Sequence, residues 1–287
     1  MHNDDSSESA LSAEQTYQFD TFGYLVIPDA LTPQQIDRIK STLQRPAEQW
    51  DNAEDKSCGP LHWDPIWRDL LDLPTLSPIL EALLGDPGLM DRRIASADLR
   101  EPLPTYRLDH INIHTDRGQG FSGGMLHGGR GVNGTFGYHD GRFQNGLLAV
   151  SFELYDTHPN DGGFACIPGS HKSNVTLPPS WQDLSKGIVD VVKRISAVPG
   201  DAIIFTEALT HGTLPWTATS ERNTVFYKYS PHHASWTSDY FDPDDFRQYD
   251  DMTDRKLSLL EPPNLSLIHI SEPTRPRLIS YAVFCLK

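Results

Sequence analysis

A histidine and an arginine, His211 and Arg222, stand eleven residues apart in the second half of the chain. The tight-turn sequence Pro199-Gly200-Asp201 leads toward the histidine. The segment 214–221 then reverses the chain, and the arginine begins the next apolar run, 224–229. Across such a reversal both side chains can face one barrel interior. There an imidazole could hold a metal ion, and a guanidinium could bind a small dicarboxylate through two parallel hydrogen bonds.

A second histidine strengthens this interpretation. His127 precedes His211 by 84 residues and is followed by Gly128 and Gly129, which leave room for another group to approach its side chain. Non-haem iron oxygenases bind their metal through two histidines and one carboxylate and leave the remaining positions for cosubstrate and oxygen. His127 and His211 are therefore candidate metal ligands, and Arg222 is a candidate ligand for a small dicarboxylate.

Four segments together resemble the phytanoyl-CoA dioxygenase family, and the resemblance spans roughly residues 19–231. The most specific are Pro168-Gly169-Ser170-His171-Lys172 and the interval from His211 to Arg222; the others are Asp20 to Pro28 and the stretch from Trp67 to Gly85. The resemblance implies a double-stranded β-helix core, Fe(II) on the two histidines, and 2-oxoglutarate with its far carboxylate on Arg222. It also implies a small-molecule substrate and O2 as reaction partners.

The chain departs from the family at one iron ligand, because the family's His-x-Asp becomes His127-Gly128-Gly129. One interpretation is that another carboxylate completes the site, with Asp109, Asp140 and Glu153 as candidates. A second is an open position beside Gly129 for water or chloride, as in related halogenases. A third is an inactive jelly-roll protein that binds a small ligand. We expect a dioxygenase that hydroxylates a small organic substrate, with the other two as alternatives.

Another histidine, His171 in the Pro-Gly-Ser-His-Lys segment, could also be taken for a metal ligand. The resemblance places it in a loop after a core strand. We therefore expect a structural role, or a place at the substrate rim.

Composition excludes several other partners. The net charge of −15 argues against nucleic acid, whose binding requires clustered Lys and Arg, and against anionic lipid surfaces. The three cysteines are far apart, so neither a disulfide framework nor a thiolate zinc site is indicated. The start of the chain is acidic and Ser-rich, and no apolar run is long enough to span a membrane. We expect a cytoplasmic protein.

The elements that must position these residues follow from local patterns. Residues 24–27 form a plausible strand, and Thr32 with Gln35 predicts the start of a helix. A second helical stretch covers about residues 63–84. After residue 106, short apolar runs alternate with turns, including the hairpin signal Asp140-Gly141, which is typical of a jelly roll.

We therefore predict a mainly β fold with flanking helices, a cupin-like double-stranded β-helix. Residues 1–12 are expected to be a disordered tail and residues 13–262 a single oxygenase domain. Within this domain, 13–100 is the helical part and 101–235 the jelly-roll core. Residues 263–287 are expected to be a non-native tail, because Ser266 to Arg277 resembles a translated sequencing adaptor. The alternative is a genuine C-terminal strand.

Overall fold

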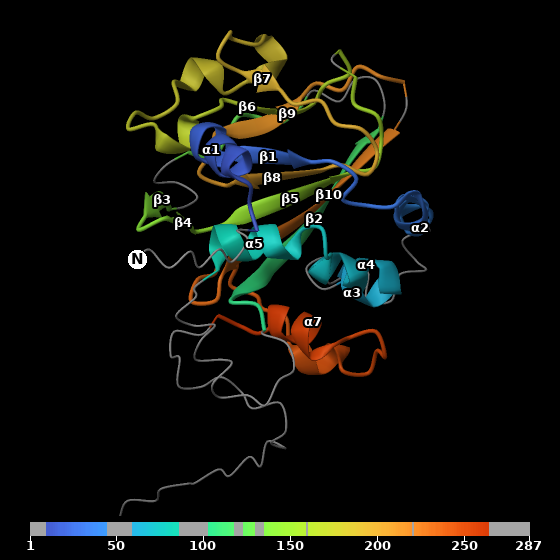
Figure 1. Cartoon of the computed structure of the whole chain (residues 1–287). Coiled ribbons are helices and arrows are strands. Elements are labelled where there is room, and N and C mark those ends of the chain that lie inside the picture. The colour runs from blue at the N-terminus through green and yellow to red at the C-terminus, as the bar shows by residue number, and fades with distance from the viewer. Residues whose placement is uncertain are drawn as a thin grey trace, which may run out of the picture.

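The protein is described by a computed structural model that covers residues 10–44, 59–85, 103–117, 123–129, 135–158, 160–219 and 221–263 (Figure 1). Of the predicted tail 263–287, only Pro263 is among these residues. At the other end the described residues include three residues of the expected tail 1–12, namely Ala10, Leu11 and Ser12. Leu11 is buried, and Ser12 caps the first helix through a capping box with Gln15.

Two antiparallel sheets form the centre of the molecule. The larger sheet has the strand order β1, β8, β5, β10, β2, and the smaller has the order β7, β6, β9. The strands of the larger sheet are β1 (Tyr24–Ile27), β8 (Ala202–Thr206), β5 (Leu148–Glu153), β10 (Glu221–Pro231) and β2 (Tyr106–Arg117). Those of the smaller sheet are β7 (Lys193–Arg194), β6 (Gly163–Cys166) and β9 (His211–Leu214).

A separate hairpin pairs β3 (Phe136–His139) with β4 (Arg142–Asn145). Its turn is Asp140-Gly141, and both residues have positive φ values, 53° and 77°. Two left-handed residues in succession match the twist of a two-residue hairpin, so the sequence signal is confirmed and Asp140 is a turn residue.

Helices cover one face of the larger sheet (Figure 1). The helices are α1 (Ala13–Phe22), α2 (Pro33–Leu43), α3 (Gly59–Trp63), α4 (Pro65–Asp69), α5 (Ser77–Leu84) and α7 (Asp254–Leu259). The 3-10 turns are η2 (Leu70–Asp72), η3 (Ser170–Lys172), η4 (Pro179–Trp181), η5 (Leu184–Lys186) and η6 (Pro243–Phe246). None of the helices in the described parts of the chain is long and apolar enough to cross a membrane.

Two predicted helical segments have different outcomes. Thr32 and Gln35 form the expected capping box, and Pro33 is the first residue of α2. The stretch 63–84 is not one helix, because α4, η2 and α5 share it. The prolines in this stretch explain the interruption, since proline lacks an amide hydrogen and restricts the residue before it.

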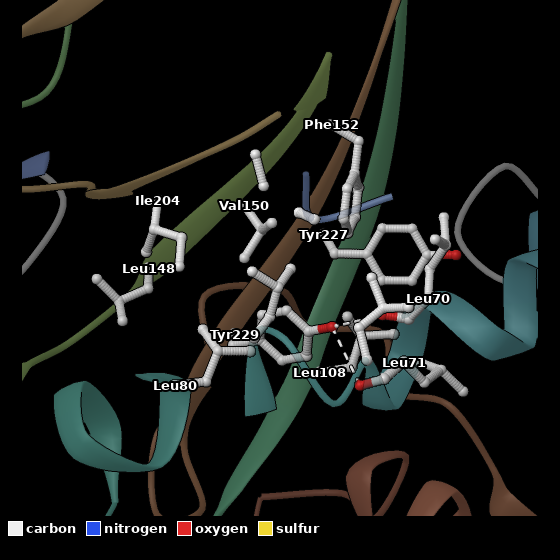
Figure 2. Close-up of a cluster of buried hydrophobic side chains, with 14 of the residues drawn as sticks. Leu70, Leu71, Leu80, Leu108, Leu148, Val150, Phe152, Ile204, Tyr227 and Tyr229 are labelled. Atoms are coloured by element: carbon white, nitrogen blue, oxygen red, sulfur yellow. Dashed lines mark hydrogen bonds between the residues drawn. The ribbon is translucent and has the colours of Figure 1, made fainter. Parts of the chain in front are cut away.

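Alternation along the central strands separates two cores. Figure 2 shows the core on the helix side, where Leu148, Val150 and Phe152 of β5 lie with Tyr227 and Tyr229 of β10. The Tyr227 hydroxyl donates to the Trp67 carbonyl at 2.7 Å, which ties this face to α4.

The opposite face of the same strands packs on the smaller sheet. Ala149, Ile203 and Phe205 of the larger sheet share a second cluster with Phe164 and Cys166 of β6. The two sheets thus lie face to face, with the helices outside. The predicted double-sheet fold with flanking helices is confirmed.

Candidate active site

The two histidines predicted as metal ligands meet between neighbouring strands. His127 and His211 form an isolated antiparallel bridge, in which each amide donates to the other's carbonyl at 2.8 and 2.9 Å. Their ring centroids are 4.3 Å apart, with the ring planes inclined at 58°. The fold therefore brings together two imidazoles that are 84 residues apart in the sequence.

Backbone carbonyls fix the orientation of both rings. His127 Nδ1 lies 2.9 Å from the Met125 carbonyl oxygen, and His211 Nδ1 lies 2.7 Å from that of Leu209. Because a carbonyl can only accept, each Nδ1 carries the hydrogen. In the neutral imidazole, Nε2 then holds the lone pair that a metal ion needs, an arrangement common in histidine metal sites.

Burial keeps His211 in this neutral form. Its pKa is lowered to about 4, mainly because burial disfavours the charged ring; His127 acts in the same direction, and Glu207 opposes it. Phe205 covers the ring, with centroids 4.6 Å apart. At neutral pH the His211 side chain is therefore a shielded, uncharged electron-pair donor.

Two glycines allow this close approach. A Cβ on Gly212 would lie 2.9 Å from the Met125 carbonyl oxygen, and one on Gly128 would lie 2.5 Å from that of Leu209. Gly129 has a φ of +105°, a conformation that side chains rarely adopt, and a Cβ there would contact only Thr210 Oγ1, at 3.6 Å. The backbone at the family's carboxylate position is therefore shaped for glycine.

The three carboxylates considered from the sequence lie elsewhere. Asp140 occupies the β3–β4 turn, and Asp109 pairs with Arg107 at 3.2 Å and with the His110 ring at 2.7 Å. Glu153 pairs with Arg222. Over the described residues, no group of three or more His, Cys, Asp or Glu side chains is assembled for a metal ion.

A carboxylate that the sequence analysis missed lies beside the histidine pair. Glu207 follows β8 and is buried, with Oε2 3.8 Å from His211 Nε2 and Oε1 2.8 Å from Lys228 Nζ. Burial raises its pKa, but the opposing effects of His211 and Lys228 prevail, so the pKa lies below its ordinary value. The only sequence signal is an acidic residue in the segment 202–209, in which all other residues except Thr206 are apolar.

Arg222 lies on the face of β10 opposite the buried residues Val225, Tyr227 and Tyr229. It is buried, and its Nη2 donates to Glu153 Oε2 at 3.1 Å. Glu153 in turn accepts from Ser151 Oγ at 2.8 Å. The guanidinium carbon lies 5.6 Å from the ring centroid of Trp216. A carboxylate and an aromatic ring thus orient the arginine, whose fork of five donors suits a dicarboxylate.

His171 takes a structural position. It is fully buried, and its Nε2 donates to the Asp20 carbonyl oxygen at 3.0 Å. Its ring stands edge-on to Phe136 at 4.3 Å. These contacts fasten the loop after β6 to α1 and confirm that His171 is not part of the histidine pair.

Comparisons with known proteins agree with this fold. The chain is 25% identical over 221 residues to the ectoine dioxygenase of Sphingopyxis alaskensis, covering 74% of this chain and 66% of the relative, just under two thirds. The crystal structure of HygX from Streptomyces hygroscopicus, with nickel and 2-oxoglutarate bound, superposes with a TM-score of 0.63. That match has 24% identity and covers 79% of this chain and 90% of HygX.

A second solved structure gives the same result. EctD from S. alaskensis, in its apoform, has a TM-score of 0.52 and 20% identity, and the match covers 79% of each chain. No protein-family model matches the chain. The protein therefore shares the jelly-roll fold of these structures.

Proposed function

We propose that this chain is an Fe(II)- and 2-oxoglutarate-dependent oxygenase of the phytanoyl-CoA dioxygenase type that hydroxylates a small organic substrate. The observation that carries the proposal is the meeting of His127 and His211 with each Nδ1 bound to a carbonyl. Two Nε2 lone pairs are then available to one metal ion. Iron and 2-oxoglutarate are supported further by the bound ligands of HygX and by the name of the curated relative.

Different residues of the chain would bind the iron and the 2-oxoglutarate. His127 and His211 would hold the iron, and Arg222 would bind the far carboxylate of 2-oxoglutarate, while Glu153 accepts a hydrogen bond from the guanidinium and orients it. Phe164 and Phe205, whose ring centroids lie 6.1 and 4.6 Å from that of His211, exclude water from one side of the ring.

Bound iron with 2-oxoglutarate supplies the oxidising chemistry. The balanced reaction converts a substrate C–H, O2 and 2-oxoglutarate into the alcohol, succinate and carbon dioxide. One oxygen atom enters the alcohol and the other enters succinate.

A halogenase is the second candidate, favoured by the space beside Gly129. It would convert a C–H, chloride, a proton, O2 and 2-oxoglutarate into the chlorinated product, water, succinate and carbon dioxide. A third candidate, an inactive ligand-binding jelly roll, differs from both because it would not consume 2-oxoglutarate.

The proposal is tested by measuring succinate release from 2-oxoglutarate with iron and ascorbate, in the absence of a prime substrate. We expect slow release by the wild type and none by His211→Ala. Iron stoichiometry should fall from one per chain to near zero in that variant. Iron retained by His211→Ala, or no succinate from the iron-loaded wild type, would refute the proposal.

A further inference from the structure

We propose that Glu207, in the turn between β8 and β9, is the third protein ligand of the iron held by His127 and His211, and that Lys228 positions its carboxylate. The inference rests on the proposed function, because it concerns the same metal. It gives the site two histidines and one carboxylate without the family's His-x-Asp spacing.

The donor atoms of Glu207 and His211 lie close enough to bind one metal ion. Glu207 Oε2 and His211 Nε2 are 3.8 Å apart. Imidazole nitrogens and carboxylate oxygens lie about 2.0–2.2 Å from a bound metal ion such as zinc. Two such ligands are therefore about 3–4 Å apart, depending on the angle at the metal. The observed 3.8 Å lies at the wide end of this range. Because the described residues hold no assembled group of three metal ligands, the proposal requires Glu207 and the two histidines to draw together around the ion when it binds.

No hydrogen atom lies between His211 Nε2 and Glu207 Oε2. His211 Nδ1 carries the ring hydrogen because it donates to the Leu209 carbonyl. In the neutral ring Nε2 therefore presents a lone pair, and an ionised carboxylate oxygen can only accept. At 3.8 Å no hydrogen bond joins them. Two facing acceptors in a buried site are stabilised by a cation between them.

The two carboxylate oxygens of Glu207 face different partners. Oε1 lies 2.8 Å from Lys228 Nζ, and Oε2 is the oxygen on the side of His211. The side chains of Glu207 and Lys228 are 3% and 16% exposed, so solvent does little to screen this pair. Lys228 thus fixes the carboxylate with one oxygen directed to the histidine, as outer partners of metal ligands commonly do.

The backbone at Gly128 and Gly129 leaves room for the turn that carries Glu207. A Cβ on Gly128 would lie 2.9 Å from the Glu207 carbonyl oxygen. Gly128 therefore lets the 207–209 turn close against the His127 segment, while Gly129 supplies no carboxylate. Gly128 thus allows the backbone of Glu207 to lie beside the segment that carries His127.

The experiment is a calorimetric and visible-absorption titration of the metal-free protein with Co(II), which reports ligand type without turnover. The variants are Glu207→Gln and, as a matched control, Glu153→Gln, which changes another buried glutamate paired with a cation. We expect one Co(II) per wild-type chain and an affinity on the order of 100-fold weaker in Glu207→Gln, since loss of outer partners alone costs about 10–100-fold. Glu153→Gln should bind Co(II) like the wild type.

A second variant serves if Glu207→Gln does not fold. Because Glu207→Gln leaves Lys228 without its counter-charge, the double variant Glu207→Gln/Lys228→Met repeats the titration in a neutral site if the single variant does not fold. Wild-type affinity in the folded variant lacking Glu207 would overturn the inference and leave the proposed function standing. No Co(II) bound by the wild type would overturn both.

Discussion

The two faces of strand β10 carry different kinds of side chain: one face is packed in the main core, and the other carries buried charges. Val225, Tyr227 and Tyr229 point to the helices and are packed in the main core, as Figure 2 shows for the two tyrosines. Arg222 and Lys228 lie on the other face, where each pairs with a buried glutamate. Strand alternation thus separates side chains that stabilise the fold from those proposed to carry the chemistry.

The inner face of β10 buries its charges in pairs of opposite sign. Arg222 with Glu153 and Lys228 with Glu207 are two cation–carboxylate pairs, six residues apart along β10. Burying either charge alone would be costly, whereas the opposite charge of the partner offsets part of that cost. Changes on this face should therefore alter ligand binding, and changes on the helix face should alter stability alone.

The largest effect on the inner face is expected from Arg222→Ala. Loss of one partner of a buried charge pair costs about 2–5 kcal/mol, so 2-oxoglutarate affinity should fall by roughly 30- to several-thousand-fold. Calorimetry with the Ni(II)-loaded protein measures this change. Arg222→Lys keeps the charge but loses the planar fork, so its affinity should lie in between.

The matched control for this variant removes the stranded carboxylate. Arg222→Ala/Glu153→Gln leaves no uncompensated buried charge and should fold more stably than Arg222→Ala, yet bind 2-oxoglutarate no better. Wild-type affinity in either variant would contradict the role given to Arg222.

A comparable effect on the helix face is expected from Leu148→Ala, because this residue is fully buried in the main core. Truncating a buried leucine costs about 2–5 kcal/mol of unfolding free energy. Urea unfolding should show this loss, while Co(II) affinity of the folded protein should not change. A large loss of metal affinity without a loss of stability would contradict the separation of the two faces.

Tyr227→Phe should have a smaller effect. It removes the hydroxyl that donates to the Trp67 carbonyl at 2.7 Å, and a buried hydrogen bond contributes about 0.5–1.5 kcal/mol. Thermal unfolding measures the change, with Phe152→Leu as a packing control on the same face. Unchanged stability would mean that this hydrogen bond does not hold α4 to the sheet.

An effect that appears only on acidification concerns His171, outside both faces. Its pKa is lowered to about 4, mainly by burial, so protons bind the unfolded chain more tightly than the folded one. The contribution to stability is full above about pH 6.5 and is lost as pH falls toward 4, by at most about 1.4 kcal/mol per pH unit. His171→Gln should flatten the unfolding free energy over this window; an unchanged slope would exclude His171 as its source.

Much of the fold could be predicted from the sequence because its signals are local. Tyr24–Ile27 is a strand, Thr32 caps α2, and Asp140-Gly141 turns a hairpin, each determined by neighbouring residues. Residues 188–198 are rich in Ile and Val, yet they contain only the short strand β7, Lys193–Arg194, because strand pairing depends on a distant partner. The domain boundaries remain predictions.

The candidate site was predictable only in part for the same reason. His127, His211 and Arg222 could be selected from residue type and spacing, and the fold brings the two histidines together. Glu207 could not, since its relation to the histidines depends on how the β8–β9 turn packs against Gly128. An acidic residue four positions before a histidine has no such meaning until both are placed.

The most direct test of the proposed iron site is an anaerobic titration with Fe(II) and 2-oxoglutarate, followed through the weak visible metal-to-ligand charge-transfer band, with and without chloride. We predict a band at one Fe(II) per chain that does not shift with chloride, because Glu207 fills the third protein position. A band that shifts with chloride would favour an open position beside Gly129. No band would contradict the central claim that His127 and His211 hold iron with 2-oxoglutarate.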